Sequence, residues 1–328
     1  MLPLRTNFAN PVDVINFLKT ESLAGRKCAL IIVTDTHGGG VRAPGALAAI
    51  SEDGKCAGYI SNGCVDADMF SQAVAAIKDG HVKTVRYGAG SPYMDIRLPC
   101  GGAVDLMIIP NPDRNMIIDI ATSLEQRRTI VFAASIEKGL ELTADQKHDT
   151  VLGDDDRFYV RCDPKLCLRI AGRGTEPIAL MRTAHALDFK VVLQSPDMAV
   201  LDAAKGLGYQ AELLTDISNA PDCVDDAHTA FIMMFHDHDW EMPLLLEALR
   251  GRAFYIGALG GRRTHSSRCN ALMKAGASDE AIARIRGPIG LIPSVRNASY
   301  LAISVLAEII DIYESPYLGC DFNRHVAL

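Results

Sequence analysis

Two cysteines of this chain, Cys64 and Cys100, lie in turns that contain glycine. The first turn reads Ser-Asn-Gly-Cys over residues 61–64, and the second reads Pro-Cys-Gly-Gly over residues 99–102. Glycine lets the backbone bend sharply and leaves a neighbouring sulfur atom approachable, which a cysteine that only packs in a core does not need. We therefore predict that both thiols contact a partner molecule. The glycines assigned to the same site are Gly63, Gly101 and Gly102.

A third glycine-rich turn, residues 37–45, precedes both cysteines. Three consecutive glycines followed by Arg42 offer backbone amides and a cation, a combination that binds phosphate-like groups. The alternative is a plain flexible connection between two strands. Because three such turns fall within the first hundred residues, we predict one ligand site to which Gly39, Gly40 and Arg42 contribute.

The second half of the chain has a glycine loop, Gly-Arg-Gly-Thr-Glu-Pro over residues 172–177, between an apolar strand and a helix. Gly172 and Gly174 would allow close approach of a phosphate, and the helix N-terminus attracts an anion. Pro177 replaces the third glycine of the dinucleotide motif. The acidic residue expected at the end of the second strand is displaced to Asp197. The loop therefore supports a dinucleotide-type fold more strongly than NAD binding.

His236, Asp237 and His238 follow the fourth strand predicted in this half. In a doubly wound sheet the first and fourth strands flank the ligand crevice, so these residues should lie beside the glycine loop. We predict that they contact a ligand. Metal binding by the two histidines and capping of the next helix by Asp239 are the alternatives.

Another glycine turn, residues 257–261, follows the fifth strand and enters a helix. Arg262 and Arg263 come next, where positive charge opposes the helix dipole. We interpret this turn, with Gly257 and Gly260, as a site for an anion.

The helices and strands that must position these residues divide the chain into three segments. Residues 1–110 predict an α+β domain, residues 111–163 a connector with a helix and a hairpin, and residues 164–328 a Rossmann-like domain. The fold class is therefore α/β, with a doubly wound parallel sheet in the last part. The strands predicted there span 166–171, 190–193, 211–214, 229–235 and 253–256. In the first domain the predicted helices span 11–25 and 66–78, and the strands 28–34, 46–50, 55–61, 82–87 and 103–109.

Composition narrows the classes of function. The chain has 328 residues, of which 48% are hydrophobic, yet no stretch reaches the roughly 18 apolar residues of a membrane span. Nine cysteines without a C-x-x-C pair argue against a disulfide framework and a structural zinc site. A net charge of −7 disfavours nucleic acid as the main partner. We predict a cytoplasmic protein that binds neither membranes nor nucleic acid.

Several segments together resemble the xanthine dehydrogenase accessory factor family, also called XdhC/CoxI. The family's G-rich turn with R-x-P-G-A, its S-G-G-C-V-E and C-G-G segments and its strand followed by H-D-H all have counterparts here. So do its Y-I-G-x-x-G-S-R-R, G-P-I-G-L and A-I-S-x-L-A-E-I-I segments. The counterparts are residues 40–46, 61–66, 100–102, 235–238, 255–263, 287–291 and 302–310.

The resemblance implies a chaperone that binds molybdenum cofactor, assists its sulfuration and inserts it into an enzyme of the xanthine dehydrogenase or aldehyde oxidase type. The cargo would be molybdopterin cofactor or its cytosine dinucleotide form. Cys64 and Cys100 would contact molybdenum or a transferable sulfur, and Gly172, Gly174, Arg262 and Arg263 the phosphate end. The implied partners are an apo molybdoenzyme, a cysteine desulfurase, a molybdopterin nucleotidyltransferase and further copies of the chain.

Two other functions stay open at this point. The sheet and the first two glycines of the loop also fit an NAD(P)-dependent oxidoreductase, although no Tyr-x-x-x-Lys pattern accompanies them. A metal-dependent hydrolase built on His236 and His238 is the third possibility. We favour a chaperone without catalytic turnover over both.

Overall fold

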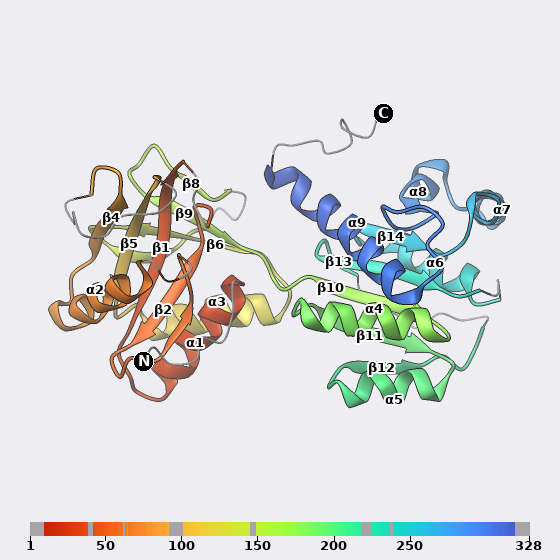
Figure 1. The fold of residues 1–328 in the computed structure, drawn as a ribbon, viewed down its shortest axis with the longest axis horizontal. Coiled ribbons are helices and arrows are strands. Elements are labelled where there is room, and N and C mark those ends of the chain that lie inside the picture. The colour runs from red at the N-terminus through yellow and green to blue at the C-terminus, as the bar shows by residue number, and fades with distance from the viewer. Residues whose placement is uncertain are drawn as a thin grey trace. The chain divides into compact units, whose positions relative to one another are not determined.

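The computed structural model describes residues 10–38, 42–61, 63, 65–91, 101–144, 149–217, 225–236 and 239–318. The chain divides into two compact units, Met1–Pro164 and Lys165–Leu328, which are described separately below (Figure 1). Among the described helices, none is long and apolar enough to cross a membrane.

The first unit is built around an antiparallel sheet with the strand order β3-β2-β1-β5-β4. Its central strand is buried on both faces from residue 28 to residue 33, which explains the continuous apolar run there. The strands are β1 (Cys28–His37), β2 (Leu47–Ser51), β3 (Cys56–Gly58), β4 (Lys83–Gly88) and β5 (Ala103–Pro110). The strand predicted over 55–61 therefore ends earlier, because the backbone amides of Ile60 and Ser61 bond to the Asp66 side chain instead of a neighbouring strand.

Helices cover both faces of this sheet (Figure 1). On one face Met69, Ala73 and Ile77 of α2 (Asp66–Asp79) pack against Ile31 and Val33 of β1. On the other face lie α1 (Pro11–Leu23) and α3 (Arg114–Glu125), whose first turns are capped by the side chains of Asn10 and Asp113.

Residues 111–163, predicted to be a connector, contain α3 and a second antiparallel sheet with the order β7-β6-β9-β8. The hairpin predicted there is confirmed as β6 (Ile130–Ser135) and β7 (Gly139–Leu142). Phe132, Phe158 and Val160 of this sheet join the core that α1 and α3 form on the first sheet. The additional strands are β8 (Val151–Leu152) and β9 (Phe158–Cys162).

The second unit confirms the predicted Rossmann-like fold. Its sheet is parallel and has the order β12-β11-β10-β13-β14-β15. Strands β11 and β12 are added on one side of β10 and strands β13 to β15 on the other, so the strand order switches between β10 and β13. The strands are β10 (Cys167–Gly172), β11 (Lys190–Ser195), β12 (Gln210–Leu213), β13 (Thr229–Met234), β14 (Tyr255–Ala258) and β15 (Ile285–Arg286).

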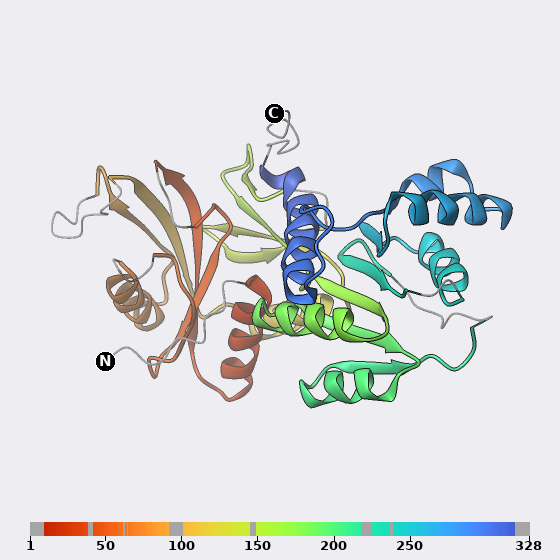
Figure 2. The same cartoon turned by 45° about the vertical axis from the view of Figure 1, so that its right-hand side comes forward.

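Two groups of helices enclose this sheet (Figure 2). The first group packs on the face of Leu168 and Ile170, and the second on the face of Phe231 and Met233. The first group is α4 (Thr175–Ala186), α5 (Met198–Gly206) and α9 (Ala298–Leu318). The second is α6 (Glu241–Arg250), α7 (Arg262–Lys274) and α8 (Asp279–Ala283).

Candidate functional site

Five strand termini of the first unit meet at one edge of its sheet. Because each neighbouring pair is antiparallel, the ends of β1, β3 and β4 lie beside the starts of β2 and β5. We call this the glycine edge, defined by the terminal residues His37, Leu47, Gly58, Gly88 and Ala103. All three predicted glycine turns of the first unit adjoin this edge in the chain.

The first and third of these turns touch through their backbones. His37 pairs with Ala103 in the sheet, and a Cβ atom added to Gly38 would lie 3.3 Å from the Cα atom of Gly102. Gly38 and Gly101 also adopt left-handed backbone angles, with φ of 73° and 70°. Glycine is therefore required by conformation at both positions.

A buried carboxylate holds the turn that leads to Cys64. Asp66 is fully buried, and its Oδ1 accepts hydrogen bonds from the amides of Ile60 at 3.1 Å and Ser61 at 2.9 Å. Its Oδ2 accepts one from the Gly63 amide at 3.2 Å. In return the Ser61 hydroxyl accepts the Val65 amide at 2.9 Å. Reasoning from the sequence missed Asp66, because an acidic residue at the start of a helix is ordinary.

Arg42, a predicted site residue, reaches the same turn. Its Nη1 donates to the carbonyl of Tyr59 at 3.4 Å, and its guanidinium lies 4.8 Å from the centre of the Tyr59 ring. Since Tyr59 is two residues before Ser61, this contact joins the first glycine turn to the one that carries Cys64.

A fourth glycine turn at this edge was not predicted. Gly88 and Gly90 both have left-handed backbone angles, and the Ala89 amide between them donates to the carbonyl of Gly102 at 3.1 Å. The G-x-G pattern after a strand would have revealed this turn. It extends the glycine edge across β4.

Four of the predicted residues in this unit, Gly39, Gly40, Cys64 and Cys100, lie outside the described residues. The other thiols that the structure describes include two deeply buried ones. Burial raises the pKa of the Cys28 thiol to about 11 and that of the Cys162 thiol to about 12. These two are packing residues, in contrast to the role predicted for the thiols of the glycine turns.

In the second unit the glycine loop lies at the junction of β10 and β13. A Cβ atom on Gly172 would come within 2.6 Å of the Met234 carbonyl oxygen, so only glycine fits there. Gly174 precedes α4 with φ of 79°. The structure brings His236 to this loop, where its Nε2 lies 3.3 Å from Oε1 of Glu176. Asp237 and His238 lie outside the described residues.

A buried ion pair supports the other glycine turn of this unit. Arg268 of α7 donates to both carboxylate oxygens of Glu241, with distances of 2.9 and 3.1 Å, and to the Leu259 carbonyl at 2.7 Å. Since Glu241 is the first residue of α6, this pair joins the start of α6 to the turn before α7. Gly260 in that turn has φ of 131°, a backbone angle that favours glycine. At Gly257 the reason is space, because a Cβ atom there would strike the Tyr255 ring.

The two arginines predicted to bind an anion are exposed at the start of α7. Arg262 and Arg263 open the helix, whose first turn contains no acidic residue and whose cap residue, Gly261, has no side chain. Neither guanidinium forms an ion pair with another side chain in the described part of the chain. Their placement allows contact with an anion at this helix N-terminus.

The carboxylate of Asp197 does not take the ribose-binding place of the dinucleotide motif but caps a helix. Its Oδ1 accepts the Ala199 amide at 3.0 Å and caps α5. The end of β11 instead presents Gln194 and Ser195, both fully buried. This arrangement differs from the dinucleotide pattern, which needs an acidic residue at that strand end.

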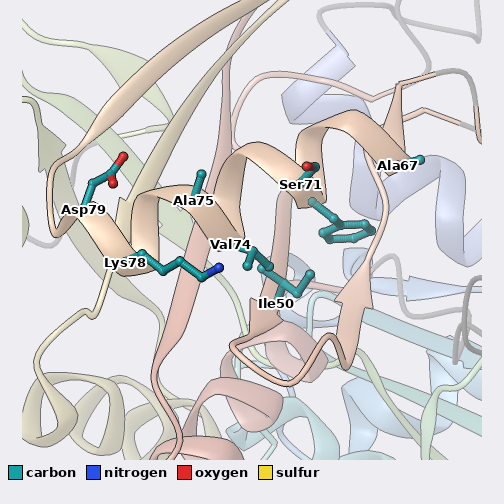
Figure 3. A pocket seen from close by; sticks show the side chains of 8 residues that line it. Ile50, Ala67, Ser71, Val74, Ala75, Lys78 and Asp79 are labelled. Atoms are coloured by element: carbon teal, nitrogen blue, oxygen red, sulfur yellow. The ribbon is translucent and has the colours of Figure 1, made fainter.

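A shallow hollow runs along α2 on the first unit (Figure 3). Val74 lies along its middle, Lys78 and Asp79 lie toward one end, and Phe70 also lines it. Among the described residues, none that was predicted for the site lines this hollow.

Comparisons with known proteins cover both units. A family model described as the XdhC Rossmann domain matches residues 168–309, and one described as the XdhC and CoxI family matches residues 22–88. The chain is 30% identical over 306 residues to the molybdenum cofactor insertion chaperone PaoD of Escherichia coli K12, covering 91% of this chain and 87% of that protein.

A solved structure has a similar fold. It is described as a xanthine dehydrogenase from Bacillus halodurans and matches with a TM-score of 0.72 at 19% identity, covering 92% of this chain and 96% of that one. At this identity the likeness concerns the fold alone.

Proposed function

The chain belongs to the XdhC and CoxI family, and from this membership we propose that it is a molybdenum cofactor insertion chaperone. Its relative in Escherichia coli is named for that role, and the match extends over most of both chains. The proposed client is a molybdoenzyme, which receives the cofactor from this protein.

The observation that carries the proposal is the gathering of glycine turns at one edge of the first sheet. Gly38, Gly63, Gly88 and Gly101 all have positive φ angles there. Backbone amides in such turns suit a phosphate group, and Arg42 adds a positive charge. Cys64 and Cys100, which adjoin described residues of these turns, would contact molybdenum or a transferable sulfur.

The second unit has proposed cofactor contacts of its own. Gly172 and Gly174 allow close approach of a phosphate beside His236, and Arg262 and Arg263 supply positive charge at a helix N-terminus. We keep these residues, with Gly257 and Gly260, as proposed cofactor contacts.

Finer parts of the function remain predictions. They are assistance in sulfuration by a cysteine desulfurase, a client of the xanthine dehydrogenase or aldehyde oxidase type, cooperation with a molybdopterin nucleotidyltransferase, assembly into homo-oligomers and a cytoplasmic location. The form of the cargo, plain or cytosine dinucleotide, belongs with them.

The test is retention of the cofactor. The full chain is incubated anaerobically with molybdenum cofactor and passed through gel filtration, and molybdenum and pterin are measured in the protein peak. We expect near-stoichiometric co-elution, reduced in Cys64→Ala and Cys100→Ala but not in Cys56→Ala, whose thiol lies near the opposite edge of the sheet. Full retention in both turn variants would refute the assignment of the thiols, and no co-elution would refute the chaperone role.

An NAD(P)-dependent oxidoreductase is the second candidate, favoured by the strand order and by the close approach at Gly172. The capping role of Asp197 weighs against it. Saturable binding of NADPH together with hydride transfer to a substrate would favour this candidate.

A further inference from the structure

A polar cluster at the glycine edge has the composition of a cation site. Asp35 and His37 of β1 and Asp105 of β5 each present a ligand atom, and the three atoms lie within 4.8 Å of one another. His37 Nε2 is 3.2 Å from Oδ2 of Asp35 and 3.7 Å from Oδ2 of Asp105. We propose that these residues bind a divalent cation of the Mn²⁺ or Zn²⁺ type, with side chains other than those predicted to contact molybdenum or phosphate.

The backbone explains why the three side chains converge. The pairing of β1 with β5 shifts register between Val33 and Asp35, so Thr34 is an extra residue. Without this bulge Asp35 would share the face of Ile31 and Val33, which α2 covers. With it, Asp35 pairs directly with Asp105.

The scaffold holds the ligands in a defined arrangement. Residues two apart on a strand share a face, so His37 lies on the same side as Asp35. Asp105 belongs to the face of Met107 and Ile109, beyond the end of the core. Ligands bound to one ion with bonds of about 2.1 Å lie roughly 3 Å apart, so small side-chain movements would complete the coordination.

The chemistry of the donors favours a borderline cation with open positions. Two carboxylates and one imidazole suit Mn²⁺ or Zn²⁺ better than a soft ion such as Cu(I), which prefers thiolate and thioether ligands. More than half of the Asp35 and His37 side chains is exposed. Water or an anionic ligand could therefore occupy the remaining coordination positions.

Arg86 is the competing partner in this cluster. Its Nη1 lies 3.5 Å from Oδ2 of Asp105, while its Nε donates to the carbonyl of Ala89. With neutral His37, the two carboxylates and Arg86 leave a net charge of about −1. A bound divalent cation would make the cluster positive, which suits an anionic cargo; this last consequence rests on the proposed function, whereas the cation site does not.

The test uses the untagged full chain after treatment with EDTA and gel filtration. Mn²⁺ binding is followed by electron paramagnetic resonance and Zn²⁺ binding by calorimetry, without molybdenum cofactor. We expect one saturable site per chain, and affinity at least tenfold lower in Asp105→Asn and His37→Asn. Asp53→Asn, in the β2–β3 turn at the opposite edge, is the matched control and should bind like the wild type.

Two results would overturn the proposal. One is the absence of saturable binding of either ion, and the other is equal affinity in the wild type and both ligand variants. Circular dichroism and thermal unfolding verify that each variant is folded, and Asp35→Asn replaces any variant that is not. Because no cofactor is present, failure here leaves the chaperone role intact, and loss of cofactor retention leaves the cation site intact.

Discussion

The Asp66 carboxylate accepts the amide of Gly63, the residue before Cys64, at 3.2 Å. The first residue of α2 thus holds the chain immediately before Cys64, one of the two predicted site thiols. The same carboxylate accepts the amides of Ile60 and Ser61, so a single buried side chain satisfies three backbone donors. Its removal leaves those donors unpaired in the interior, which costs more than the loss of one exposed hydrogen bond.

We expect Asp66→Ala to lower the free energy of unfolding by about 2–4 kcal/mol and to reduce cofactor retention in the variant that still folds at low temperature. Asp66→Glu keeps the charge and should retain more cofactor than the alanine variant. Asp68→Asn is the control, since Asp68 bonds the Tyr87 hydroxyl rather than the turn. Urea unfolding and molybdenum analysis measure both effects. Equal cofactor retention in Asp66→Ala and the wild type would contradict the positioning role.

Gly172→Ala should destabilise the second unit, because the added methyl group would meet the Met234 carbonyl oxygen at 2.6 Å. We expect a loss of about 1–3 kcal/mol, typical of overpacking against a rigid backbone. Gly206→Ala is the matched substitution, since nothing lies within 4 Å of its added Cβ and alanine is the better helix former. Differential scanning calorimetry compares the two. If the two variants unfold at the same temperature, the close approach of β10 and β13 does not exclude a methyl group at residue 172.

Glu241→Ala should cost about 3–5 kcal/mol, because it leaves the Arg268 guanidinium buried without its carboxylate. Both side chains are at most 4% exposed. Glu125→Ala breaks an exposed ion pair with Lys19 and should cost about 0–1 kcal/mol. Chemical denaturation gives the two values, and similar small losses would show that Arg268 finds another partner.

The buried thiols should resist alkylation. The pKa values of Cys28 and Cys162, about 11 and 12, are far above the ordinary thiol value because burial disfavours the thiolate. At pH 8 both remain protonated, and the reactive thiolate would form only as the pH rises toward these values. Iodoacetamide at pH 8 followed by peptide mass spectrometry should modify them in urea but not in the native chain. Rapid native modification of Cys162 would show that this core opens.

The parallel sheet was predictable because each of its strands is a short apolar run followed by a helix, a local pattern. Its strand order then predicted that His236 would lie near the glycine loop, and its contact with Glu176 agrees. Asp197 could not be interpreted in the same way, because only the structure reveals that its carboxylate caps α5.

The antiparallel first unit was harder to predict. Its central pairing joins β1 to β5, which are far apart in sequence, and no local pattern encodes such a partnership. β8 is two exposed residues long and gives no periodic signal. Asp66 was missed because an acidic residue at the start of a helix is ordinary in sequence, and only the structure reveals the three backbone amides that its carboxylate accepts.

Because of the bulge at Thr34, the number of residues between Val33 and Asp35 decides on which face of the sheet the later side chains of β1 lie. Removing or adding one residue between Val33 and Asp35 would exchange which face Asp35 and His37 occupy, while leaving the upstream core pairing of β1 unchanged. Changes in chain length are therefore not tolerated here as they are in a loop. Among homologous sequences, the number of residues between Val33 and Asp35 should vary less than the residue types found there.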